Sequence, residues 1–240
     1  MTLTNLRGED LGVLDGVESG SVTLSATSRL RASGSLRLVD TGQDIDWFNM
    51  HARVDYVPEG IEGWPVGTFI MSAPHREVSE HRTVSDVELQ GLLAYADRAV
   101  LKQVTHHSGS DARYLLGPLF KSFTRVPTAI ELPSFALKES VYDAGRSVLT
   151  VINEVPNAGG YSALSTDGRG ALLVSKYIRP SLRPVSYRFV EGSKAIHSAS
   201  WTIDRDIFAV PNVVICVGTG GTGSRQMEGE TNLTDRKSVV

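Results

Sequence analysis

Apolar and polar residues alternate with a period of two along several short stretches of this chain. Between Met50 and Tyr56, the even-numbered residues are apolar and the odd-numbered ones are His, Arg and Asp. The same alternation occurs around Val22 to Leu24 and Leu36 to Leu38. Because successive side chains of a strand point to opposite faces, the pattern predicts strands with one buried face and one face in water. Turn residues between these stretches favour a small barrel or sandwich over residues 19–91.

The residues that follow this β-rich block have the composition of a helix. Leu92 to Lys102 contains Leu, Ala and Arg, with apolar residues spaced along one helical face. We expect this helix to pack against an open end of the barrel. Residues 1–102 are therefore predicted to form a first β-barrel domain that ends in a helix.

Residues 103–180 are interpreted as a linker and a small α/β domain, with one short helix between 103 and 134. A strand over Leu137 to Tyr142 precedes a turn, and a helix is predicted from Val148 to Val155. The hydroxyl of Ser147 can accept a first-turn backbone N–H, and Pro156 and Asn157 are expected to end this helix.

A β-hairpin is predicted from Tyr161 to Val174. Its turn, Asp167 to Gly170, is of the Asp-Gly type, in which glycine adopts the positive φ of a tight hairpin. Strand-like runs then return between 184 and 217, so residues 181–234 are interpreted as the start of a second β-barrel, cut short after Val217. The predicted fold is thus mainly β (β+α), with two small barrels flanking the α/β insert.

The last six residues, Asp235 to Val240, can be back-translated as a common short-read sequencing adapter read in frame. We therefore expect residues 235–240 to be an adapter artefact and the natural chain to continue beyond Thr234. The alternative is a natural polar tail.

Composition excludes several classes of protein. The 41% hydrophobic content permits a globular core, and the net charge of −3 does not predict a basic nucleic-acid-binding surface. The single cysteine, Cys216, excludes an internal disulfide and is expected to be a buried, inert thiol. No apolar run is long enough for a membrane segment, and the N-terminus lacks a signal-peptide pattern.

Three motifs could indicate ligand binding, and each has a simpler interpretation. Gly218 to Gly223 matches GxGxxG, but the following helix and strand of a dinucleotide fold are missing, so a flexible loop is favoured. His106 and His107 beside Asp111 could bind a metal, but adjacent residues of an extended segment point to opposite faces, which favours a solvated loop. Asp40, Asp44 and Asp46 lack the glycine and glutamate of a calcium loop, which favours a hairpin tip.

The remaining candidates are aromatic and histidine residues. Trp47, Trp64 and Trp201 could form a ligand platform, although anchoring in a core or a subunit interface is the favoured interpretation. His75 and His81 flank an acidic stretch and are interpreted as part of a polar turn. No catalytic, cofactor-binding or metal-binding residue is predicted, so we do not expect an enzyme.

Five segments have the order and spacing of one known class of protein. These are Leu14–Gly20, Arg31–Leu36, Trp64–Pro74, Gly159–Pro184 and Ala209–Val214. Their order resembles the hub or minor tail protein at the tail tip of long-tailed bacteriophages, in particular siphophages that infect actinobacteria. The resemblance covers most of the chain and includes no catalytic signature.

The resemblance implies a structural protein of the virion that is assembled in the host cytoplasm. In the family, each chain contributes two barrels, and a homotrimer forms a ring with pseudo-sixfold symmetry between the tail tube and the distal tail proteins. The channel passes the tape measure protein and then DNA, without sequence-specific binding. Two alternatives stay open: a carbohydrate-binding adhesin, which should show a clustered aromatic and acidic patch, and the hub portion of a tail-associated cell-wall hydrolase whose catalytic domain lies outside this chain.

Overall fold

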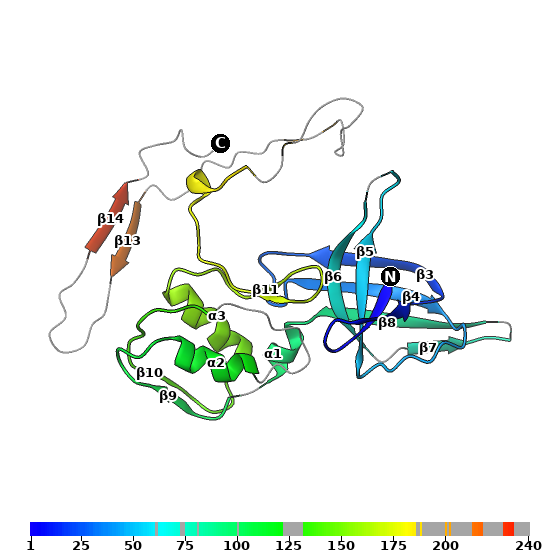
Figure 1. The fold of residues 1–240 in the computed structure, drawn as a ribbon, viewed down its shortest axis with the longest axis horizontal. Coiled ribbons are helices and arrows are strands. Elements are labelled where there is room, and N and C mark those ends of the chain that lie inside the picture. Colours follow the sequence, from blue (N-terminus) through cyan, green and yellow to red (C-terminus); the bar gives the residue numbers. More distant parts are fainter. Residues whose placement is uncertain are drawn as a thin grey trace. The chain divides into compact units, whose positions relative to one another are not determined.

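The computed structural model divides the chain into two compact units, Met1–Tyr177 and Ile178–Val240 (Figure 1). Almost all of the first unit is described. The described residues are 1–60, 62–72, 75–80, 82–99, 101–121, 132–185, 188, 200, 202, 213–217 and 228–232.

One antiparallel sheet dominates the first unit, which confirms the prediction of a mainly β fold. The hydrogen-bonded order is β2-β1-β5-β6-β8-β4-β3, with β7 paired to β8. In the described part of the chain this order does not close, because β2 and β3 are its two ends, so the domain is an open sheet and not a closed barrel. Figure 1 shows β5 and β6 crossing β3, β4 and β8 at a steep angle, so the sheet curls over itself. The strands are β1 (Thr2–Asn5), β2 (Asp10–Val13), β3 (Val17–Leu24), β4 (Ala32–Val39), β5 (Met50–Tyr56), β6 (Trp64–Met71), β7 (His75–Val78) and β8 (Thr83–Gly91).

The concave face of the curled sheet holds the first hydrophobic core, which we call the inner core. Its members come from alternate positions of β1, β4, β5, β6 and β8, as the period-two pattern predicts. Phe69 and Leu89 are fully buried there, and Met50, Trp47 and Val54 pack at its margin.

Part of the opposite face, on β5 and β6, is not in water, which corrects the expectation for His51 of β5. His51 is 1% exposed and Thr68 on β6 is 4% exposed. The Nε2 atom of His51 lies 3.0 Å from the hydroxyl of Tyr95. A second hydrophobic core lies on this side, formed by three short helices and the segments around them. The helices are α1 (Ala94–Arg98), α2 (Arg113–Lys121) and α3 (Val148–Ala158).

The helix expected from Leu92 to Lys102 is shorter than predicted. It ends at Arg98 because Ala99 is extended and tertiary hydrogen bonds replace helical ones. The Ala99 carbonyl accepts from the Val148 amide, and the Leu101 amide donates to the Arg146 carbonyl. The single helix expected between 103 and 134 is confirmed as α2. Strands β9 (Val104–His106) and β10 (Ser140–Tyr142) pair beside these helices.

Helix α3 confirms the predicted helix but corrects both of its ends. Ser147 is the N-cap residue, yet its hydroxyl makes no capping hydrogen bond. Pro156 lies inside the helix, which continues to Ala158. Because Pro156 is in the last turn, its carbonyl accepts from the amides of Gly159 and Tyr161 as the helix ends.

The predicted hairpin is confirmed as β11 (Ser165–Thr166) paired with β12 (Leu172–Leu173). Its positive φ belongs to Gly170, at 85°, and not to the Gly of the Asp-Gly pair. The Gly170 amide donates to the Asp167 carbonyl, and the Asp167 amide donates to the Ala171 carbonyl. Residues 167–171 connect the two strands, and the turn among them is followed by one left-handed residue, Gly170.

The second unit contains a short helical turn, η1 (Pro180–Leu182), and two strands, β13 (Val213–Val217) and β14 (Glu228–Asn232). The strands pair antiparallel, with Val213 opposite Asn232. The strand expected at VVICV is thus present, whereas the rest of the predicted second barrel and residues 235–240 lie outside the described residues. Among the helices of the described residues, none has both the length and the apolar character needed to cross a bilayer.

Candidate assembly surface and the Arg53 cluster

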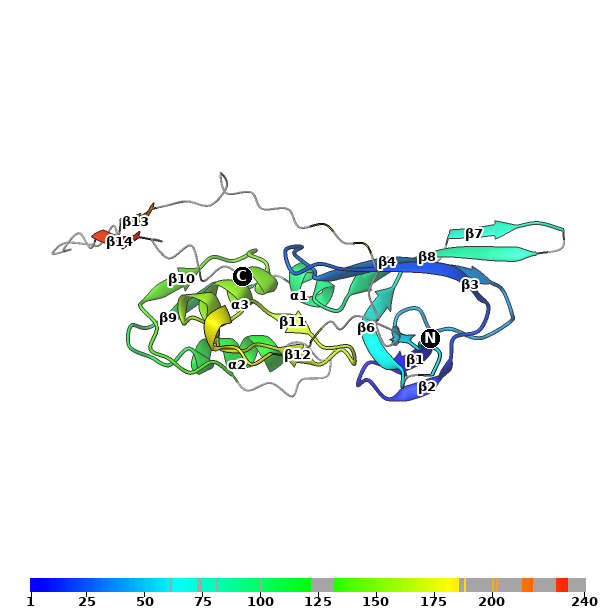
Figure 2. The ribbon, with the colours of Figure 1, turned by 90° about the horizontal axis from the view of Figure 1, so that it is seen from above.

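The two ends of the sheet form a candidate assembly surface, which we call the sheet edges and define as β2 and β3. All four residues of β2 are exposed, and seven of the eight residues of β3 are exposed. Apolar side chains lie on both strands, with Val13 64% exposed and Leu24 57% exposed. An edge strand carries unpaired N–H and C=O groups that can pair with another chain. Figure 2 shows these strands on opposite sides of the curled sheet.

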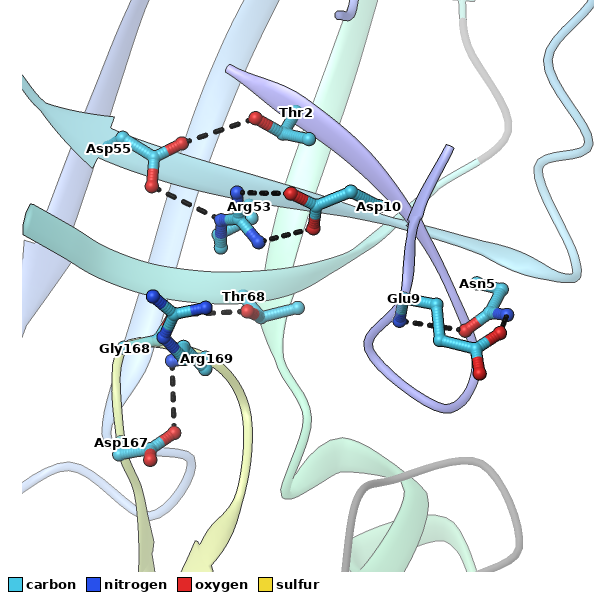
Figure 3. Close-up of polar contacts among 10 residues, drawn as sticks. All are labelled: Thr2, Asn5, Glu9, Asp10, Arg53, Asp55, Thr68, Asp167, Gly168 and Arg169. Atoms are coloured by element: carbon cyan, nitrogen blue, oxygen red, sulfur yellow. Dashed lines mark hydrogen bonds and ion pairs between the residues drawn. The ribbon is translucent and has the colours of Figure 1, made fainter. Parts of the chain in front are cut away.

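An ionic cluster fastens strand β2 to the rest of the sheet. Arg53 of β5 makes a bidentate contact with Asp10 of β2, with 3.0 Å between Nη2 and Oδ2, and its Nε lies 3.1 Å from Oδ1 of Asp55 (Figure 3). Thr2 of β1 donates to Asp55 at 3.3 Å. The Arg53 side chain is only 12% exposed, so this is a partly buried, charge-assisted arrangement. We call these four residues the Arg53 cluster.

The contact between Arg53 and Asp10 favours the charged form of both groups. The hydrogen bond from Arg53 holds the pKa of the Asp10 carboxyl below its ordinary value, and the hydrogen bond to Asp10 raises the pKa of Arg53. Charge-assisted hydrogen bonds of this kind connect the edge strand β2 to β5.

The tip of the β11–β12 hairpin lies on strand β6, beside this cluster. The Thr68 hydroxyl donates to the Gly168 carbonyl at 3.1 Å, and the Cα of Gly168 lies so close to the Pro65 carbonyl that a Cβ would overlap it. Asp167 holds the loop, since its Oδ1 accepts from the amides of Arg169 and Ala171. Arg169 extends from the tip toward the sheet and contributes to the lowered pKa of Asp10 (Figure 3).

A second polar network connects the β3–β4 loop to the helices. Arg29 donates to Asp97 of α1 at 2.7 Å and to the hydroxyl of Thr150 of α3 at 3.0 Å. Ser147 also takes part, since its hydroxyl accepts from Arg29 and donates to Asp97. Ser147 does not cap α3 because its hydroxyl is instead hydrogen-bonded to Arg29 and Asp97.

The structure separates the histidine pair that the sequence placed in a solvated loop. His106 lies on β9, is 5% exposed and has its Nε2 3.1 Å from the Ser110 carbonyl, whereas His107 is exposed. Asp111 is used elsewhere, as an N-terminal cap of α2, because its Oδ1 accepts from the Arg113 amide at 2.8 Å. An Asp two residues before a helix is a recognisable cap signal that sequence reasoning overlooked.

The hydrogen bonds of Asp111 predict how the stability of the fold depends on pH. Hydrogen bonds from Ser134 and from the amide and side chain of Arg113 lower its pKa from 3.8 to about 2. A carboxyl with a lowered folded-state pKa stabilises the fold above its unfolded pKa of about 3.9 and loses that contribution as the pH falls toward the folded value. We expect the stability difference between wild type and Asp111→Asn to be largest above pH ~4 and to shrink between pH ~4 and ~2 in urea titrations. Asp143→Asn, an exposed turn residue, is the control, and an equal pH dependence in both variants would contradict the prediction.

The three aspartates of the expected hairpin tip do not converge on one point. Asp46 caps its own loop through the amides of Phe48 and Asn49, and Asp40 accepts from the Gly42 amide and lies 3.6 Å from Arg76. Within the described ranges, no group of three or more His, Cys, Asp or Glu residues could hold a metal ion. His75, expected in a polar turn, is the first residue of β7.

The two tryptophans among the described residues have different surroundings. Trp47 packs at the margin of the inner core, and Trp64 contacts Tyr56 with ring centroids 5.0 Å apart while remaining 47% exposed. Trp201, His81, the Gly218–Gly223 segment and the side chain of Cys216 lie outside the described residues.

Comparison with solved structures relates this fold to tail proteins. No family model and no curated sequence matches the chain. The tail protein of Neisseria meningitidis MC58 is similar in structure, with a TM-score of 0.52 and 13% sequence identity over 77% of this chain. A 43 kDa tail protein of prophage MuSo2 from Shewanella oneidensis has a TM-score of 0.48 and 14% identity over 73% of this chain. The chain spans about half the length of both proteins, 52% and 54%. The chain therefore shares the fold of the Neisseria tail protein.

Proposed function

We propose that this chain is a structural component of a bacteriophage tail and acts as a hub at its tip. The single observation that carries the proposal is an open antiparallel sheet, of the same fold as a tail protein, that presents two exposed edge strands. The role needs assembly and not catalysis, so we propose a protein without enzymatic activity.

The two sheet edges supply the physical basis for assembly. β2 and β3 differ in length and sequence, so a contact between one copy's β2 and the next copy's β3 is head-to-tail. A head-to-tail contact repeated with a closing rotation generates a ring. We propose that three copies form this ring. Each β2 would then pair with the β3 of a neighbouring copy, so that both edge strands are covered.

Such a ring would sit in the virion between the tail tube and the distal tail proteins, after assembly in the host cytoplasm. Its channel would pass the tape measure protein and then DNA. The net charge of −3 supports passage of DNA without retention, because phosphate binding requires clustered Lys and Arg.

The proposal is tested by the mass of the full chain in solution, measured by multi-angle light scattering over a range of concentrations. We expect a trimer for the wild type. Val13→Lys on β2 and Leu24→Lys on β3 each place a charge on a sheet edge and should give monomers. Val57→Lys, at a residue that is 75% exposed but lies in the loop between β5 and β6, should remain trimeric. A wild-type monomer at every concentration, or equal behaviour of the three variants, would overturn the proposal.

A further inference from the structure

A small pocket opens where the loop after β4 meets the ends of β7 and β8. Its volume is about 140 Å³, enough for one side chain or one small ligand. It combines acidic, basic, aromatic and hydroxyl groups, and none of its lining residues belongs to the Arg53 cluster or to the hairpin tip. The lining residues that matter here are Asp15, Asp40, Asp44, Trp47, Arg76 and Ser85.

The walls of this pocket are held in place by hydrogen bonds. Gln43 accepts from the Asp15 amide at 3.0 Å and donates to the Val13 carbonyl at 2.8 Å, which joins the loop after β4 to the loop after β2. The Asp40 amide donates to the Thr83 carbonyl, which joins the same loop to β8. The pocket is therefore preformed, and a ligand would not have to order it.

The pocket carries an excess of negative charge. Three carboxylates line it against one guanidinium, and Arg76 lies 3.6 Å from Asp40. Within the described part of the chain, Asp15 and Asp44 form no ion pair. The field inside the pocket therefore favours a cation over an anion or a neutral group.

The interior of the pocket contains a buried hydroxyl group. Ser85 is 5% exposed, and its hydroxyl forms no hydrogen bond with another side chain of the described residues. The hydroxyl is therefore available to accept a hydrogen bond from a ligand that enters the pocket. Trp47 adds an aromatic wall, and an indole ring is the side chain that best attracts a cation placed over its face.

We propose that this pocket receives a Lys or Arg side chain of another tail protein. The charged head would lie between Asp15 and Asp44, donate to the Ser85 hydroxyl and contact Trp47. The inference rests on the proposed function only for the identity of the protein that carries the basic side chain. The pocket itself is a property of the isolated chain.

The test uses the full chain and two small probes, N-acetyl-arginine amide and N-acetyl-lysine amide. Binding is followed by NMR through the indole N–H signal of Trp47, assigned with Trp47→Phe. We expect at least one probe to shift this signal in a saturable manner. Asp44→Asn and Ser85→Ala should each weaken binding, the former by about tenfold, because it removes a charge-assisted contact. Glu59→Gln, an exposed loop carboxylate outside the pocket, removes the same charge and should leave binding unchanged.

Four results would overturn the inference. The first is no saturable shift with either probe, and the second is equal weakening by Asp44→Asn and Glu59→Gln, which would indicate attraction to net charge alone. The third is a shift caused by a neutral methyl glycoside and by neither basic probe, which would assign the pocket to a sugar. Loss of the trimer in Asp44→Asn would place the basic side chain on a second copy of this chain and overturn its assignment to another protein. Because the probes need no ring, failure here is distinguishable from failure of the light-scattering test.

Discussion

Replacing Gly168 with alanine is expected to destabilise the first unit by about 1–3 kcal/mol, the usual cost of overpacking a tight contact. The backbone of Gly168 has no positive φ, so alanine meets no conformational penalty at this position. The cost comes instead from the new Cβ, which would overlap the Pro65 carbonyl of β6. The hairpin tip must then shift and lose the hydrogen bond from Thr68 to the Gly168 carbonyl.

The free energy of unfolding in urea measures this effect, and hydrogen exchange of the Ala171 amide locates it. Gly117→Ala is the matched control, because among the described residues its Cβ would meet only a Leu132 methyl group, at 3.6 Å. Gly117 lies inside α2, where alanine is favoured by about 0.5–1 kcal/mol over glycine. Similar losses for both variants would show that the hairpin tip does not depend on close approach to β6.

Replacing Leu149 with alanine is expected to cost about 2–5 kcal/mol, the range for a fully buried leucine. Leu149 is 0% exposed and lies in the hydrophobic core between α3 and the outer side of the sheet. Because the inner core shares no side chain with this one, the variant should unfold the helical part first.

Urea unfolding followed by far-ultraviolet circular dichroism gives the free energy, and amide exchange in α3 compared with β4 shows which core is lost. Leu173→Ala removes the same atoms from a side chain that is 46% exposed and should cost far less. Equal losses for the two variants would contradict the burial of Leu149.

The sequence predicted the inner core well because that core depends on a local signal. Alternation along β5 placed Ala52 and Val54 on the core side, and the pairing of β5 with β6 then brings Phe69 opposite Ala52. The same logic located α3 through its apolar stripe and the hairpin through its Asp-Gly turn. Each of these signals spans only a few residues, so one sequence suffices to read them.

The outer side of the sheet could not be predicted in this way. His51 and Thr68 have the polar character of a solvated face, yet they are buried because Tyr95 and Gly168 lie over them. No local pattern indicates that a segment 100 residues later covers a strand. The early end of α1 has the same origin, because the Ala99 carbonyl and the Leu101 amide bond to Val148 and Arg146, which lie far along the chain.

The pocket beside Trp47 could not be predicted from the sequence either. Its aspartates, its arginine and Ser85 come from four separate segments, so the sequence showed only an acidic loop near Asp40. The Arg53 cluster likewise depends on register between β1, β2 and β5, which sequence alone did not specify.

The long reach of the hairpin contact also sets an order of events during synthesis. The Thr68 to Gly168 hydrogen bond spans 100 residues and the Arg29 to Thr150 bond spans 121, whereas the inner core needs only residues up to Gly91. At about 5–20 residues per second, the ribosome takes roughly 4–16 s to add the 79 residues between Gly91 and Gly170. Throughout that interval the nascent sheet exposes the apolar surface around Ile70 that the second core later covers. The newborn protein is therefore most prone to aggregate, and most dependent on chaperones, while its first domain is already formed.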